Sequence, residues 1–155
     1  MNVFKRAGSA SMFMRRSAIE LLGGFDETLG LGAATPWKGG EDIDYITRAV
    51  SSGLPVYYRP GLDIFHDDPP PPDRRQVQRA HGAACATGRL LRIHKFPLWY
   101  VAYWSAGSLA LVLASAMKLD LMGTQYHWVS FLGRFEGWLP PPHSVSSTPA
   151  VANQP

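Results

Sequence analysis

Residues 37–66, WKGGEDIDYITRAVSSGLPVYYRPGLDIFH, join a glycine turn, an acidic pair, a helical pattern and a β-prone run that ends in a lone histidine. Gly39 and Gly40 allow the backbone to turn tightly. Four apolar residues then recur at helical spacing: Ile43, Ile46, Ala49 and Val50. This pattern predicts a helix from Glu41 to about Val50.

Glu41 and Asp42 stand side by side at the start of this predicted helix. The helix dipole favours an ionised carboxylate at that end. Asp42 can therefore be held charged and open to a cleft, as a general base requires. Two simpler alternatives stay open: Asp42 is the N-cap of the helix, and Glu41 is a solvated acid of its first turn.

The chain resembles the acceptor-side half of family 2 glycosyltransferases, which have the GT-A fold, over about residues 7 to 95. An ordered series of motifs carries the resemblance: GSASMFMRR at 8–16, GGFDE at 23–27, GGED at 39–42, YYRP at 57–60 and then His66, with a weak recurrence in GRFEGW at 133–138. The resemblance implies an α/β fold class. We expect a partial GT-A-like, Rossmann-like half domain followed by carboxy-terminal helices, one of them a candidate transmembrane helix.

The resemblance also implies roles for single residues. Asp42 corresponds to the base that deprotonates the acceptor hydroxyl, Glu41 to its acidic neighbour, and His66 to a ligand of the metal or the donor phosphate. Four further residues are expected at the acceptor or donor: Trp37, Gly39, Gly40 and Arg79. A divalent metal, Mg²⁺ or Mn²⁺, a nucleotide-sugar donor and a glycan, lipid or other hydroxyl acceptor are implied as well. Alternatively, Trp37 covers the core and His66 is a strand-end histidine without a ligand.

Enzymes of this family bind the nucleotide through an amino-terminal βαβ half that ends in a metal-binding Asp-x-Asp motif, and no such half precedes Met1. We therefore expect a fragment of an inverting glycosyltransferase that is inactive alone. The alternative is a non-catalytic, membrane-associated remnant or interaction module. Processive family members carry Gln-x-x-Arg-Trp, whereas QVQRA at 76–80 lacks the tryptophan, which disfavours a polysaccharide synthase.

Composition limits the remaining function classes. Fifteen Lys and Arg against twelve Asp and Glu give a net charge of +3, which is too small to indicate nucleic-acid binding. The single cysteine, Cys85, excludes an internal disulfide and has no partner at zinc-type spacing. We expect no nucleic-acid partner, and the cysteine content fits a reducing compartment.

The chain divides into four predicted regions. They are an α/β acceptor-side half domain at 1–68, a proline hinge with a basic helical segment at 69–95, apolar membrane-associated helices at 96–139 and a disordered tail at 140–155. Extended, β-prone pieces are predicted at residues 10–14, 56–58 and 64–65. Ser17 and Glu20 form a capping-box pattern for a short helix that a glycine pair ends. Asp44 and Arg48 are four residues apart and are predicted to pair on the helix surface.

The run from Leu98 to Met117 contains twenty residues and no charge. At about 1.5 Å per residue it is long enough to cross a hydrocarbon core of about 30 Å. Aromatic residues cluster at its start, where amphipathic rings favour the membrane interface. Basic residues are more frequent before the run than after it, which predicts a membrane-associated protein with its catalytic part on the cytoplasmic side. Because serines dilute the run, an interfacial helix or a buried helix pair stays an alternative.

Overall fold

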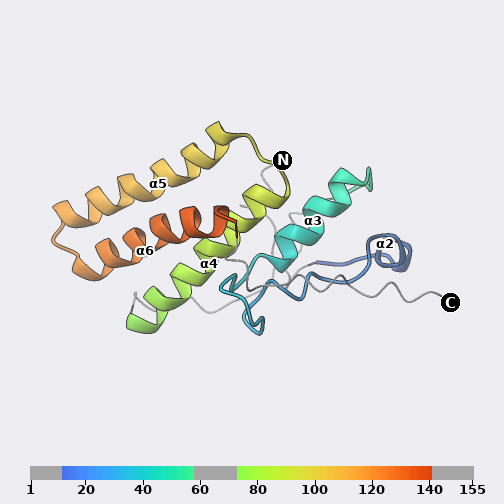
Figure 1. The fold of residues 1–155 in the computed structure, drawn as a ribbon, viewed down its shortest axis with the longest axis horizontal. Helices are drawn as coiled ribbons and strands as arrows, with labels where there is room; N and C mark the ends of the chain where they lie inside the picture. Colours follow the sequence, from blue (N-terminus) through green and yellow to red (C-terminus); the bar gives the residue numbers. More distant parts are fainter. Residues whose placement is uncertain (1–11, 58–72, 141–155) are drawn as a thin grey trace.

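The computed structural model describes residues 12–57 and 73–140, and its regular elements in these ranges are all α-helices (Figure 1). They are α2 (Arg16–Leu22), α3 (Glu41–Ser51), α4 (Arg74–Ile93), α5 (Leu98–Met117) and α6 (Leu121–Trp138). The predicted α/β class, a Rossmann-like half domain, is therefore wrong: the described residues form helices and no strand.

The physical reason lies in what a strand needs. Residues 12–14 and 56–57, which belong to two of the predicted β-prone pieces, have neither helix nor strand structure. A strand is stabilised by ladder hydrogen bonds to a neighbouring strand, and no neighbour pairs with either piece within the described ranges. Residues 10–11, 58 and 64–65 of the predicted strands lie outside those ranges. β-propensity without a pairing partner did not make a sheet here.

The helices follow the sequence patterns closely. The predicted helix at Glu41 begins there and ends one residue later than predicted, and the apolar run from Leu98 to Met117 is one helix with those bounds. Gly23 ends α2 with a positive φ of 74°, and the helix stops at the glycine pair as predicted. The predicted capping box is wrong, because α2 begins before Ser17 and has no side-chain cap, while the Glu20 carboxylate accepts from an arginine in the first turn instead.

α4, α5 and α6 form a helical unit in which α6 packs against both of the others (Figure 1). The contact between α4 and α6 is unusually close. A Cβ atom on Gly137 would overlap the carbonyl oxygen of Cys85, and one on Gly88 would overlap the carbonyl oxygen of Arg134. Only glycine lets the two backbones approach this far. The segment GRFEGW at 133–138, where the family resemblance recurs weakly, is thus part of a helix-packing surface.

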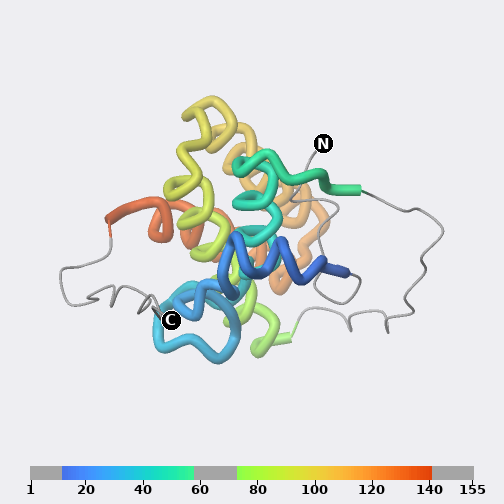
Figure 2. The backbone as a smooth tube through the Cα atoms, turned by 90° about the vertical axis from the view of Figure 1, so that its right-hand side faces the viewer, coloured from blue at the N-terminus to red at the C-terminus, as the bar shows by residue number. Residues whose placement is uncertain are grey.

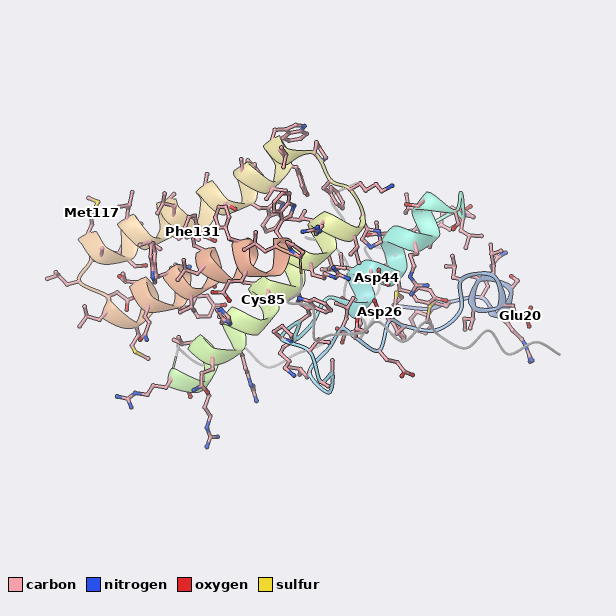
Figure 3. All side chains as sticks on the ribbon, viewed as in Figure 1. Glu20, Asp26, Asp44, Cys85, Met117 and Phe131 are labelled. Atoms are coloured by element: carbon pink, nitrogen blue, oxygen red, sulfur yellow. The ribbon has the colours of Figure 1, made fainter. Side chains whose placement is uncertain are left out.

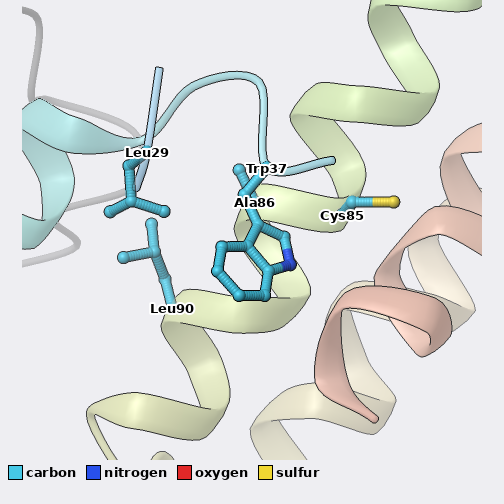
Figure 4. Close-up of a cluster of buried hydrophobic side chains, with 5 residues drawn as sticks. All are labelled: Leu29, Trp37, Cys85, Ala86 and Leu90. Atoms are coloured by element: carbon cyan, nitrogen blue, oxygen red, sulfur yellow. The ribbon is translucent and has the colours of Figure 1, made fainter. Parts of the chain in front are cut away.

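The segment between α2 and α3 has no regular structure and closes against α4 (Figure 2). The backbone N–H of Gly30 donates to the carbonyl of Trp37 at 3.0 Å, and the N–H of Lys38 donates to the carbonyl of Gly82 in α4 at 3.1 Å. A buried apolar cluster fills the space beneath: Leu29, Trp37, Cys85, Ala86 and Leu90 (Figure 4). α4 therefore contributes to two packing surfaces, this loop on one side and α6 on the other.

Candidate functional site

The predicted acidic pair lies in the first turn of α3, directly after a glycine with a positive φ. Gly40 is the N-cap, with φ 85° in the left-handed region. A Cβ at this position would also come within 2.7 Å of the Leu90 side chain. Both facts require glycine, so the second glycine of GGED is explained by backbone conformation and by close packing on α4. The turn sets where α3 begins and places Glu41 and Asp42 at its start.

Asp42 and Glu41 have different surroundings. Both side chains are half-buried. Oδ1 of Asp42 accepts from the backbone N–H of Ile43 at 2.8 Å. Because Gly40 holds the N-cap position, the capping alternative does not describe Asp42. The Glu41 carboxyl group lies against Gly30, and its buried Oε2 has no hydrogen-bond partner among the described residues. A buried carboxylate oxygen without a partner is costly, which marks this position as one where a ligand donor would be stabilising.

Asp44, two residues after Asp42, is buried in a polar network (Figure 3). Nε of Arg48 donates to Oδ2 of Asp44 at 2.8 Å, and Nε2 of His94 lies 2.9 Å from Oδ1. Burial acts to raise the pKa of Asp44, but the hydrogen bonds from His94 and Arg48 and their charges outweigh it, so that the pKa lies below its ordinary value. The predicted pairing of Asp44 with Arg48 is confirmed, whereas its placement on the helix surface is wrong.

The same network ties α3 to its neighbours. The Nη1 and Nη2 atoms of Arg48 donate to the carbonyl groups of Leu22 and Gly24 at 2.7 and 2.9 Å. His94 is the C-cap residue of α4. One buried carboxylate thereby joins the end of α2, the middle of α3 and the end of α4. We conclude that Asp44 is buried and holds the scaffold, whereas Asp42, two residues earlier, is half-buried.

The other predicted site residues lie in different surroundings. Trp37 is 5% exposed, and the Arg89 guanidinium lies over its ring at 4.5 Å from the centroid, so the core-covering alternative describes its position. Gly39 precedes the N-cap, with φ 148°. Arg79 is exposed on α4 and forms no ion pair with either acid among the described residues. The remaining residue, His66, lies outside the described residues.

The outer surface of α5 is apolar, and its inner surface is partly polar. The residues that α5 buries are Val101, Ser105 and Ser108. Leu111 and Leu113 are 50% and 60% exposed, and Met117 at the far end of the helix is 86% exposed (Figure 3). An amphipathic helix on the surface of a water-soluble protein would bury its leucines and expose its serines. On α5 these leucines are exposed and two serines are buried.

Polar contacts hold this helix to α6. Nη1 of Arg134 donates to the carbonyl of Trp104 at 3.0 Å and contacts the Ser108 hydroxyl, which places a cation between the two helices. By length and composition, α5 is the one helix in the described ranges that could cross a membrane, and only 17% of its most apolar window is buried. The prediction of a helix long and apolar enough to span a membrane is confirmed.

Comparison of the chain with family models, with curated proteins and with solved structures found no match. The resemblance to family 2 glycosyltransferases therefore rests on the ordered motifs in the sequence.

Sequence reasoning missed two polar groupings. The first is the contact of His94 with Asp44, which joins residues fifty positions apart. The second joins Cys85 and His81 of α4 to Glu136 of α6. The i, i+4 spacing of His81 and Cys85 is visible in the sequence, but the third member becomes apparent only when α6 is packed. The Gly133-x-x-x-Gly137 spacing was the available signal, because it is typical of closely packed helices.

Proposed function

We propose that this chain takes part in inverting glycosyl transfer as the acceptor-side, membrane-associated portion of a glycosyltransferase, with Asp42 as the general base. The observation that carries the proposal is the position of Asp42, half-buried in the first turn of α3 beside a buried and unpartnered Glu41 oxygen. The ordered motif series supports the same reading. Glu41 is the proposed acidic neighbour that positions the acceptor.

The proposed chemistry is a single displacement at the anomeric carbon of a nucleotide-sugar donor. Asp42 takes the proton of the acceptor hydroxyl while that oxygen attacks, and the nucleoside diphosphate leaves on the opposite face of the sugar. A positioned general base contributes about two to four orders of magnitude in rate. The start of α3 helps to keep Asp42 ionised and ready for the proton, because the helix dipole stabilises a negative charge there.

The described residues do not fit the Mg²⁺ or Mn²⁺ that the resemblance implies. Such ions take several oxygen ligands. In the described ranges, one group of His, Cys, Asp or Glu side chains is close enough to share an ion. It includes a cysteine and neither Glu41 nor Asp42. The implied ligand His66 lies outside those ranges. No step of the proposed reaction is therefore assigned to a metal.

Substitution of Asp42 by asparagine tests the role of the base. In its source cells, with the gene replaced by the variant, Asp42→Asn should lower sugar transfer from labelled nucleotide-sugars to membrane acceptors by about two to four orders of magnitude. Protein level and membrane association should not change, because the amide keeps the size of the side chain. Glu20→Gln, which changes an exposed acid of α2 outside the motif series, is the matched control and should keep full activity. Activity of Asp42→Asn within about threefold of the parent would refute the assignment.

Attachment to the membrane through α5 is the second part of the proposal. The outward leucines and inward serines of α5 support it, and three basic residues before the helix, Arg89, Arg92 and Lys95, against Lys118 after it, favour a cytoplasmic position for the acidic pair. The alternative function, a non-catalytic membrane-associated interaction module, shares this part of the proposal. It differs in predicting no effect of Asp42→Asn on any transfer reaction.

Charges on the outer face of α5 test the attachment. Leu111→Lys and Leu113→Lys should each cost about 2.5–3.5 kcal/mol of insertion if the helix centre lies in lipid. Leu21→Lys is the control, because Leu21 is 64% exposed on α2 and its replacement by lysine should leave membrane binding unchanged. Carbonate extraction, liposome flotation and protease protection of terminal tags are the measurements. A parent protein that stays soluble without detergent would refute membrane attachment, and accessible tags after extraction by carbonate would refute a spanning helix.

A further inference from the structure

Three side chains with metal-ligating atoms meet at the crossing of α4 and α6: His81, Cys85 and Glu136. Nε2 of His81 lies 2.9 Å from Oε2 of Glu136. The Cys85 sulfur lies 3.8 Å from Nδ1 and 3.9 Å from Nε2 of the same imidazole. One ligand atom from each residue falls within 4.8 Å of the other two. Figure 3 marks Cys85 on α4, where α6 crosses it.

These separations fit a shared cation. In a tetrahedral zinc site with bonds of about 2.0–2.3 Å, neighbouring ligand atoms are about 3.3–3.6 Å apart. The nitrogen–oxygen distance in the cluster is slightly shorter than this, and the sulfur–nitrogen distances are slightly longer. Small side-chain rotations of His81 and Glu136, which are 39% and 57% exposed, would bring the three atoms to bonding distance. Their exposure also leaves a path for the ion from solvent.

The scaffold beneath the cluster is rigid. His81 and Cys85 are four residues apart on one face of α4, a spacing that places two ligands on the same side of a helix. A Cβ on Gly133 would lie 2.7 Å from the carbonyl oxygen of His81, and a Cβ on Gly137 would overlap that of Cys85. Glycines on both sides of Glu136 in sequence therefore bring α6 against the two α4 ligands. Sites built on closely packed helices hold their geometry better than sites on loops.

We propose that His81, Cys85 and Glu136 bind a zinc-class divalent cation that joins α4 to α6, with a water molecule completing the coordination. The thiolate selects the metal, because sulfur ligands favour Zn²⁺ and related ions whereas Mg²⁺ and Mn²⁺ favour oxygen ligands. This site is separate from the acidic pair on α3. The cation bound here differs in class from the one that the glycosyltransferase resemblance implies, and the inference does not depend on the proposed transfer reaction.

Binding must overcome the protonation of the thiol. Burial, together with the negative charge of Glu136, raises the pKa of Cys85 to about 11, so the metal-free protein carries a thiol at neutral pH. A bound dication reverses this preference, because a coordinated thiol loses its proton outright. The reaction is therefore an exchange of one proton for one cation.

Cobalt titration of the full chain in detergent micelles tests the site. Co²⁺ added to chelator-treated protein should produce a thiolate-to-cobalt charge-transfer band that saturates at one equivalent. Zn²⁺ should abolish the band, and a large excess of Mg²⁺ or Mn²⁺ should not. Absence of the band from the folded parent protein would overturn the proposal.

Two variants and one control assign the ligands. Cys85→Ala should remove the band, and Glu136→Gln should keep a band but weaken cobalt binding by at least about tenfold. Because Glu136 is more than half exposed, its replacement does not threaten folding and keeps the test decisive if Cys85→Ala does not fold. His127→Gln, a histidine of α6 outside the cluster, should bind as the parent does. Parent-like Zn²⁺ affinity in both Cys85→Ala and Glu136→Gln would refute the site.

Discussion

Replacement of Gly137 by alanine should separate α4 from α6 and destabilise the helical unit. The added Cβ would overlap the Cys85 carbonyl oxygen, which belongs to a helix backbone and cannot rotate away. Overpacking of this kind costs about 1–3 kcal/mol, and more when backbone must move. Alanine also gains about 1 kcal/mol over glycine in a helix interior. That gain has to be removed before the overlap can be measured.

Gly107→Ala is the control for this propensity gain. Gly107 lies in the interior of α5, and a Cβ there would meet nothing within 4 Å. Gly137 is the last residue but one of α6, so its propensity gain is no larger than that of the interior Gly107, and the overlap should leave a difference of at least about 1–3 kcal/mol in favour of Gly107→Ala. For a chain of this length, about 2–4 °C per kcal/mol converts this difference to about 2–12 °C in Tm. The measurement is thermal unfolding of both proteins in the same detergent, followed by circular dichroism.

The result that would contradict the reasoning is a Gly137→Ala protein as stable as Gly107→Ala. It would mean that α4 and α6 do not approach each other closely in solution. Gly88→Ala gives an independent check, since its Cβ would overlap the Arg134 carbonyl oxygen from the opposite helix. Gly88→Ala should also have a lower Tm than Gly107→Ala.

Two further predictions concern α3. Asp44→Asn leaves Arg48 with a broken buried ion pair and should cost about 3–5 kcal/mol of unfolding free energy. The pKa of Asp44 is lowered from 3.8 on folding, so its contribution to stability is fully present above that value and is lost as the pH falls through the lower folded pKa. The parent should therefore lose stability in acid, and Asp44→Asn should lose less. Equal acid sensitivity of the two proteins in urea titrations would contradict this. Gly40→Ala should destabilise the protein by more than about 1 kcal/mol, because the alanine would be strained at a positive φ and its Cβ would collide with α4. Gly24→Ala, which has open space at its Cβ, should not. Similar Tm values for the two variants would contradict the explanation of Gly40.

Local patterns in the sequence predicted local structure well. The apolar spacing after Glu41 and the uncharged run from Leu98 are properties of a few consecutive residues, and helices α3 and α5 begin at those residues. The same local reasoning was wrong for the strands, since a β-prone piece becomes a strand only when another segment pairs with it. It was also wrong for Ser17, because α2 has Arg15 as its N-cap and so begins two residues earlier than the capping pattern predicted.

The candidate site shows the same division. Asp42 could be singled out from the sequence because a glycine pair, two acids and a helical pattern follow one another directly. Asp44 could not be distinguished from it, because its burial depends on Arg48 reaching back to the end of α2 and on His94 arriving from α4. A two-residue shift along α3 separates the half-buried Asp42 from the buried Asp44, which holds the scaffold.

By itself the sequence determined which segments become helices, where glycine must end or begin them, and that one helix is apolar enough to meet a membrane. Each of these depends on propensity, spacing or composition within a short stretch of chain. Only the tertiary structure decided which carboxylate is buried, which face of α5 is left to the outside and which residues meet across α4 and α6. These outcomes depend on contacts between residues up to about fifty positions apart, such as Cys85 with Glu136, and the packing of glycine against backbone brings those residues together.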